Sequence, residues 1–122
     1  MLRPYLRYRE NPSAETWITQ TFSPEIVDKL MEGMTGVVND PSGTGYGACR
    51  QDVLLAGKTG TAEIKESQDD TTGVERGWFI CETTEDMPNQ IAVVGMVEDV
   101  KTKGGSSYVT QKVRNIAVSY LQ

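Results

Sequence analysis

The hydrophobic pattern of this chain changes its period several times, and the first clear pattern is helical. From Ile26 to Val38, apolar residues recur three or four positions apart, which predicts an amphipathic helix. Ser23 suits the cap position, Pro24 the first helical position, and Glu25 the positive end of the helix dipole. The turn-forming run 39–43 ends this helix.

A second helical stripe closes the chain. It follows the break at 104–107 and predicts a C-terminal helix with one apolar face. The residues expected on that face are Val109, Val113, Ile116, Ala117 and Tyr120.

Between the helices, three shorter runs predict strands at 53–64, 77–82 and 90–98. A glycine-rich loop at 42–52 precedes them, an exposed polar loop at 65–76 joins the first two, and a turn is expected near 87–89. Because the links are short, the strands are expected to pair antiparallel. The predicted class is α+β, an antiparallel sheet flanked by helices.

Individual positions within these elements carry further expectations. The run from Ile91 to Val97 is almost continuously apolar, which predicts a central or doubly covered strand. Trp78 and Phe79 are expected in the core, or one of them in the wall of a pocket. At the N-terminus, β-forming residues at 4–9 and 16–21 flank a turn cluster at 10–13 and predict a hairpin.

Length and charge exclude several classes of function. The 122 residues suit one domain. A net charge of −5 offers no basic surface for nucleic acid. No run is long and apolar enough to cross a bilayer, and the first residues do not show the charged and apolar regions expected of a signal peptide. Because the chain has no histidine, it excludes Ser-His-Asp triads, Cys-His dyads and histidine metal sites.

Cysteines and acidic pairs give no sign of a metal or cofactor site. Cys49 and Cys81 are 32 positions apart and form no C-x-x-C pair, so we expect two free thiols, one in a loop and one in a strand. The pairs Asp69-Asp70 and Glu85-Asp86, with Glu82, lack calcium-loop spacing and predict solvated surface. We expect neither a metal nor a cofactor.

The most informative chemistry lies at Gly57-Lys58-Thr59-Gly60-Thr61-Ala62, which continues an apolar strand. Lys58 is a cation that suits a carboxylate or lowers the pKa of a nearby hydroxyl. Thr59 and Thr61 offer hydroxyl donors, and Gly60 lets a substrate backbone approach the strand. Strict alternation places Lys58 and Gly60 on one face and the threonines on the other. A site that uses all four must therefore lie at a sheet edge or a twist.

Two other interpretations of this segment remain. A lysine and two threonines also suit a solvated strand edge with no ligand. A nucleotide-binding P-loop is the second alternative, since Gly57-Lys58-Thr59 ends like one. That loop needs a glycine where this chain has Asp52, and the residues between form a strand-like run.

The Lys-Thr-Gly element is one of three signatures of penicillin-binding proteins and serine β-lactamases, and the wider sequence resembles the C-terminal part of a class B penicillin-binding transpeptidase domain. The segment 54–63 is similar to the active-site strand of that family. Residues 30–38 with Gly43-Thr44-Gly45 resemble the preceding helix and Gly-Thr loop, and 77–80 resembles the Trp-Phe strand that follows. The segment 91–98 and the final helix complete the resemblance, which runs from about Leu2 to Gln122.

The resemblance implies a fold and a reaction. The family has a five-stranded antiparallel sheet flanked by helices, beside an all-helical subdomain. Its active serine attacks the penultimate D-Ala of a peptidoglycan stem peptide and passes the acyl group to an amine, and β-lactams trap the same serine. By resemblance, the catalytic residues are Lys58, which organises proton transfer and attracts the substrate carboxylate, and Thr61, whose backbone N–H completes the oxyanion hole. Thr59 and Thr61 would bind the carboxylate, and Gly60 would allow close passage.

The chain departs from the family at the nucleophile. None of its serines has a lysine three positions later or an asparagine two positions later, so S-x-x-K and S-x-N are both missing. Those serines are Ser13, Ser23, Ser42, Ser67, Ser106, Ser107 and Ser119. We therefore expect residues 1–122 to be a C-terminal fragment of the domain, with Met1 an added start, and to be inactive alone.

Other functions and partners remain open. The alternatives are a stand-alone non-catalytic binding module and a part of a β-lactamase or β-lactam sensor. The expected partners of the parent protein are stem peptides and β-lactams, with no nucleic acid. We expect the parent to be membrane-anchored with this domain on the extracytoplasmic face, and this fragment to be soluble. A sheet face deprived of the nucleophile helix also predicts self-association.

Overall fold

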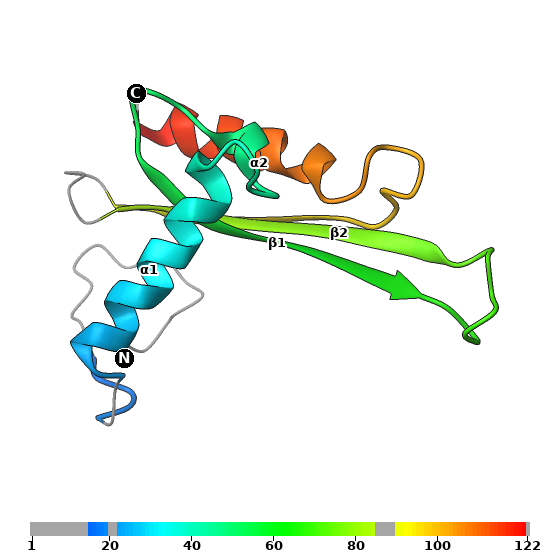
Figure 1. Ribbon diagram of the computed structural model, residues 1–122, viewed down its shortest axis with the longest axis horizontal. Coiled ribbons are helices and arrows are strands. Elements are labelled where there is room, and N and C mark those ends of the chain that lie inside the picture. Colours follow the sequence, from blue (N-terminus) through cyan, green and yellow to red (C-terminus); the bar gives the residue numbers. More distant parts are fainter. Residues whose placement is uncertain (1–14, 20–21, 85–89, 122) are drawn as a thin grey trace. The chain divides into compact units, whose positions relative to one another are not determined.

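The computed structural model describes residues 15–19, 22–84 and 90–121. Its elements in chain order are α1 (Pro24–Asn39), the 3-10 turn η1 (Tyr46–Ala48), β1 (Leu55–Ile64), β2 (Val74–Thr83), β3 (Ala92–Val97) and α2 (Ser107–Leu121) (Figure 1). The chain divides into two compact units, Met1–Leu30 and Met31–Gln122. The sheet, α2 and the last turns of α1 all belong to the second unit.

Helix α1 begins and ends where its sequence predicts. The backbone carbonyl of Ser23 accepts the N–H groups of Ile26 and Val27, which forms the first turn. A hydrogen bond from Ser23 lowers the pKa of Glu25. At the other end, the side-chain amide nitrogen (Nδ2) of Asn39 donates to the backbone carbonyl of Thr35 at 2.8 Å and to that of Leu55 at 2.9 Å. Asn39 therefore ties the end of α1 to the start of β1.

The three strands form one antiparallel sheet in the order β1-β2-β3. Gly57 pairs with Cys81, and Phe79 pairs with both Thr59 and Gly95, which fixes the register across all three strands. The α+β class predicted from the sequence is confirmed. The polar link between β1 and β2 is shorter than expected, because residues 74–76 pair with 62–64 and so belong to β2.

Helix α2 covers one face of the sheet and forms the core there (Figure 1). Phe79 is fully buried, and Val109 and Val113 are 1% exposed. A Cβ at Gly95 would lie 2.5 Å from a methyl group of Val113, so the glycine lets α2 approach β3 closely. The other buried hydrophobic residues of this core are Val38, Ala48, Leu55, Cys81, Val100 and Ala117.

Within the unit Met31–Gln122, no helix covers the opposite face of the sheet, which is called the uncovered face below. Its large apolar side chains remain exposed: Trp78 by 41%, Ile80 by 40%, Val94 by 63% and Met96 by 41%. The predictions of a core Trp78 and of a central or doubly covered third strand are therefore wrong for the described residues, since β3 is an outer strand of the sheet they form. The reason is that α2 packs on one face only, so β2 alternates between buried and exposed positions along most of its length, and β3 alternates between intermediate and exposed ones.

Two other expectations need correction. Within the predicted loop 42–52, Gly45 donates its N–H to the carbonyl of Val37, and residues 46–48 form η1. On α2, Ile116 and Tyr120 are 59% and 61% exposed, whereas Thr110 is fully buried. Its hydroxyl donates to the carbonyl of Ser107, which satisfies the polar group that the sequence pattern did not place in the core.

Most of the predicted N-terminal hairpin, segments 4–9 and 10–13, lies outside the described residues. The predicted turn near 87–89, between β2 and β3, lies outside them as well. Of the predicted strand 16–21, residues 16–19 are described, and they contain an isolated bridge at Thr16 instead of a strand. Trp17 in this segment is 59% exposed.

Candidate active-site strand

The six residues 57–62 lie within β1, at the edge of the sheet among the described strands. The apolar start of β1 anchors the strand, because Leu55 and Ala56 are fully buried. From Thr61 onward every residue of the strand is exposed. An edge strand leaves alternate backbone groups free for an incoming extended chain.

The side chains of this segment divide between the two faces as alternation predicts. Lys58 pairs across the ladder with Ile80, and Gly60 pairs with Trp78, so both lie on the uncovered face. Thr59 pairs with the buried Phe79 on the face that α2 covers. A site that uses all four residues is predicted only at a sheet edge or a twist, and β1 is an outer strand among the described strands.

Lys58 is exposed, and its ammonium donates to the backbone carbonyl of Thr59 at 2.7 Å. This bond holds the ammonium group against the backbone of its own strand. Ile80 and Trp78 lie on the same face of the sheet as Lys58 and are 40% and 41% exposed.

The two threonines have different surroundings. Thr59 is only 8% exposed, and its hydroxyl lies 2.7 Å from the hydroxyl of Thr44. Thr61 is exposed and pairs with Gly77. Thr61 is therefore the threonine that solvent reaches freely, while Thr59 already has a protein partner.

The glycines of the strand also differ. A Cβ at Gly57 would lie 2.7 Å from the carbonyl oxygen of Ile80 and 3.0 Å from the Phe79 ring, so packing within the chain requires glycine there. A Cβ at Gly60 would meet only the Cβ of Trp78, at 3.5 Å, which is an ordinary contact. Packing among the described residues does not require glycine at position 60.

The roles of Thr44 and Asn39 were not predicted from the sequence. The Gly-Thr-Gly signal at 43–45 marked the loop, but the partner of its threonine depends on how the loop folds over β1. Asn39 was assigned only to the end of the helix. Its side chain also receives a long hydrogen bond from the Cys49 thiol, at 3.8 Å.

Both cysteines are free thiols, as predicted. Cys81 lies in β2 and is fully buried, and this burial raises the pKa of its thiol to about 11. Cys49 follows η1 and is half-buried. Cys81 therefore remains protonated at neutral pH and contributes to packing.

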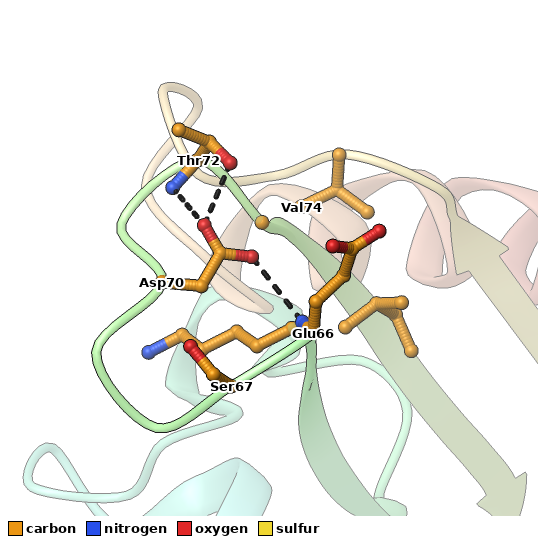
Figure 2. Close-up of a pocket in the computed structure, with 8 residues that line it drawn as sticks. Glu66, Ser67, Asp70, Thr72 and Val74 are labelled. Carbon is orange, nitrogen blue, oxygen red and sulfur yellow. Dashed lines mark hydrogen bonds between the residues drawn. The ribbon is translucent and has the colours of Figure 1, made fainter.

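A polar hollow lies at the turn between β1 and β2, at the opposite end of β1 from the anchored residues (Figure 2). Its lining includes Lys65, Asp70 and Thr72, and Lys58 is not part of it. Among the described residues there is no group of three side chains that could hold a metal ion, and no helix there has the length and apolarity needed to span a membrane.

Comparison with known proteins identifies the family. Residues 4–117 match the penicillin binding protein transpeptidase domain, and the chain belongs to that family. Penicillin-binding protein 3 of Bacillus subtilis (strain 168) is 35% identical over 114 residues, which cover 93% of this chain and 17% of that relative. A solved structure, the apo TP domain of penicillin-binding protein 3 from Burkholderia pseudomallei, is similar with a TM-score of 0.63 and 26% identity. That match covers 88% of this chain and 34% of the solved chain.

Proposed function

We propose that this chain is the C-terminal, Lys-Thr-Gly-strand portion of a peptidoglycan D,D-transpeptidase, which cross-links stem peptides by serine acyl transfer and binds penicillin. The observation that carries the proposal is the placement of Lys58 on the uncovered face of an edge strand, with the exposed Thr61 three residues later. The family match supports it.

In this proposal each strand residue has a separate task. Lys58 leaves its carbonyl partner to attract the substrate carboxylate and to organise proton transfer at the serine. Thr61 donates its hydroxyl to the carboxylate and its backbone N–H to the oxyanion that forms when the serine oxygen attacks the carbonyl carbon. Thr59 assists through its hydroxyl, which is hydrogen-bonded to the hydroxyl of Thr44. Gly60 leaves room for the substrate backbone.

The nucleophile must come from another part of the parent protein. No serine here stands in an S-x-x-K or S-x-N motif, and the chain spans less than a fifth of the curated relative it matches. The uncovered face of Trp78, Ile80, Val94 and Met96 supports the same idea, because an apolar surface of this kind normally packs against further protein. A membrane anchor outside this chain belongs to the same proposal.

A chimera tests the proposal directly. Residues of this chain would replace the matching 114-residue segment of the B. subtilis relative, and labelling by a fluorescent penicillin would be measured. The chimera is expected to be labelled, and the Lys58→Ala chimera is expected to lose at least about 100-fold in labelling rate. Lys65→Ala, beyond the strand, is the matched control and should retain labelling.

The isolated chain provides the complementary measurement. It should show no stable labelling at any serine, since it brings an anion site without a nucleophile. Labelling of the isolated chain, or equal labelling of the folded chimera with and without Lys58, would contradict the proposal.

A further inference from the structure

A lysine outside the polar loop 65–73, which joins β1 to β2, holds that loop. The ammonium of Lys101 donates to the backbone carbonyl of Thr71 at 2.5 Å and to that of Gly73 at 3.0 Å. These contacts join positions about 30 residues apart in the sequence. Lys101 lies in the connection between β3 and α2.

The same loop is held from inside by Asp70. Its carboxylate accepts hydrogen bonds from the backbone N–H of Thr72 at 2.7 Å, the Thr72 hydroxyl at 2.6 Å and the backbone N–H of Glu66 at 3.3 Å (Figure 2). These hydrogen bonds lower the pKa of Asp70 to about 2. The Thr72 N–H thus points to Asp70, and the carbonyls of Thr71 and Gly73 point to Lys101.

Both ends of this arrangement are anchored in the sheet. A Cβ at Gly73 would lie 2.4 Å from the carbonyl oxygen of Ile64, so the loop returns to β1 through a contact that only glycine allows. On the other side, Val100 is fully buried and donates its N–H to the carbonyl of Glu75 at 2.8 Å. The backbone next to Lys101 is therefore held against β2, which lowers the entropy lost when the lysine binds the loop.

We propose that Lys101 is a latch that keeps the β1–β2 loop, residues 65–73, in one conformation. With Asp70 inside and Lys101 outside, the loop at the far end of the Lys-Thr-Gly strand is preformed. Without the lysine, the carbonyls of Thr71 and Gly73 are left to water and the loop opens, while the β1–β2 ladder up to Ile64 and Val74 keeps its own pairing. The latch does not depend on the proposed transpeptidase function.

Hydrogen exchange of the 122-residue chain tests the latch. In Lys101→Met, which keeps an unbranched side chain one atom shorter but removes the donors, the N–H of Thr72 is expected to exchange at least about fivefold faster. Amides of β1 and β2 near Phe79 should be unchanged. Lys103→Met is the matched control, because the Lys103 ammonium donates only locally among the described contacts, to the carbonyl of Asp99 at 2.8 Å.

Salt distinguishes hydrogen bonding from general attraction to the acidic loop. At about 1 M salt the screening length falls to about 3 Å, so the wild-type latch should survive while a long-range attraction would not. Equal exchange at Thr72 in the wild type and in Lys101→Met would overturn the proposal. Loss of loop protection at high salt in the wild type would also overturn it. Faster exchange throughout the sheet in Lys101→Met would overturn it as well, because it would show that the lysine stabilises the whole fold.

Discussion

The hydroxyl groups of Thr44 and Thr59 lie 2.7 Å apart and join the Gly-Thr-Gly loop to the Lys-Thr-Gly strand. Two sequence signatures 15 residues apart are thereby linked through their threonines. Since Thr59 is only 8% exposed, its hydroxyl depends on this partner to satisfy its hydrogen bonding. The loop therefore supports the strand from the face opposite Lys58.

The first prediction concerns this pair. Thr44→Val keeps the shape of the side chain but removes the hydroxyl, and we expect it to lower the free energy of unfolding by about 1 kcal/mol. Thr44→Ser retains the hydroxyl and should recover most of the loss. Urea unfolding curves of the two variants measure the difference, and equal midpoints would show that the pair contributes nothing.

Asn39 offers a second test of how β1 is anchored. Asn39→Ala removes two donors, to Thr35 and to Leu55, and should destabilise the chain by about 2 kcal/mol. Asn115→Ala is the control, since Asn115 is exposed and its side chain accepts hydrogen bonds from the neighbouring Arg114. Thermal unfolding should separate the two variants. Similar midpoints would contradict the bridging role of Asn39.

Substitution by alanine should lower the stability much more at Gly57 than at Gly60, the two glycines of β1. Gly57→Ala places a methyl group 2.7 Å from a backbone oxygen of Ile80 and should cost about 2 kcal/mol of stability. Gly60→Ala meets no such contact and should change stability by less than about 0.5 kcal/mol. If position 60 faces a substrate backbone, the penicillin-labelled chimera with Gly60→Ala should nevertheless lose labelling. Stability is read from urea unfolding and labelling from gel fluorescence.

Acid should weaken the loop through Asp70. Because the folded pKa of about 2 lies below the ordinary value of 3.8, ionised Asp70 stabilises the folded state above pH 3.8. That contribution is lost as the pH falls from 3.8 through about 2. In Thr72→Val, which removes the hydroxyl donor, the pKa of Asp70 should rise toward 3.8. A carboxyl carbon titration by NMR measures both values, and an unchanged pKa in the variant would contradict the assigned cause.

Self-association through the uncovered sheet face is the last prediction. Trp78, Ile80, Val94 and Met96 should make the isolated chain dimerise at high concentration. Val94→Lys places a charge on this face and should restore a monomer. Ile116→Lys, at a similarly exposed position on α2, is the control and should leave association unchanged. Light scattering over a concentration series decides, and a wild-type monomer throughout would reject the idea.

Much of the fold is predictable because its signals are local. The start of α1 depends on Ser23, Pro24 and Glu25, which act within one turn, and the antiparallel order of the strands follows from short connections. The position of Lys58 and Gly60 on one face follows from the period of two along a strand. The candidate site was located from a six-residue motif whose chemistry is contained in its own side chains.

The amino-acid sequence alone determined the class of fold, the family resemblance and the separation of Lys58 from Thr59 across the strand. Only the tertiary structure decided which face α2 covers, and hence that Phe79 is buried while its neighbour Trp78 is exposed. It also decided that Thr59 is paired with Thr44, that Gly57 is required by packing, and that Lys101 reaches the loop at 71–73. The physical reason is that periodicity and capping act between neighbours in the sequence, whereas these contacts join distant segments whose proximity exists only after the sheet and its helix have packed.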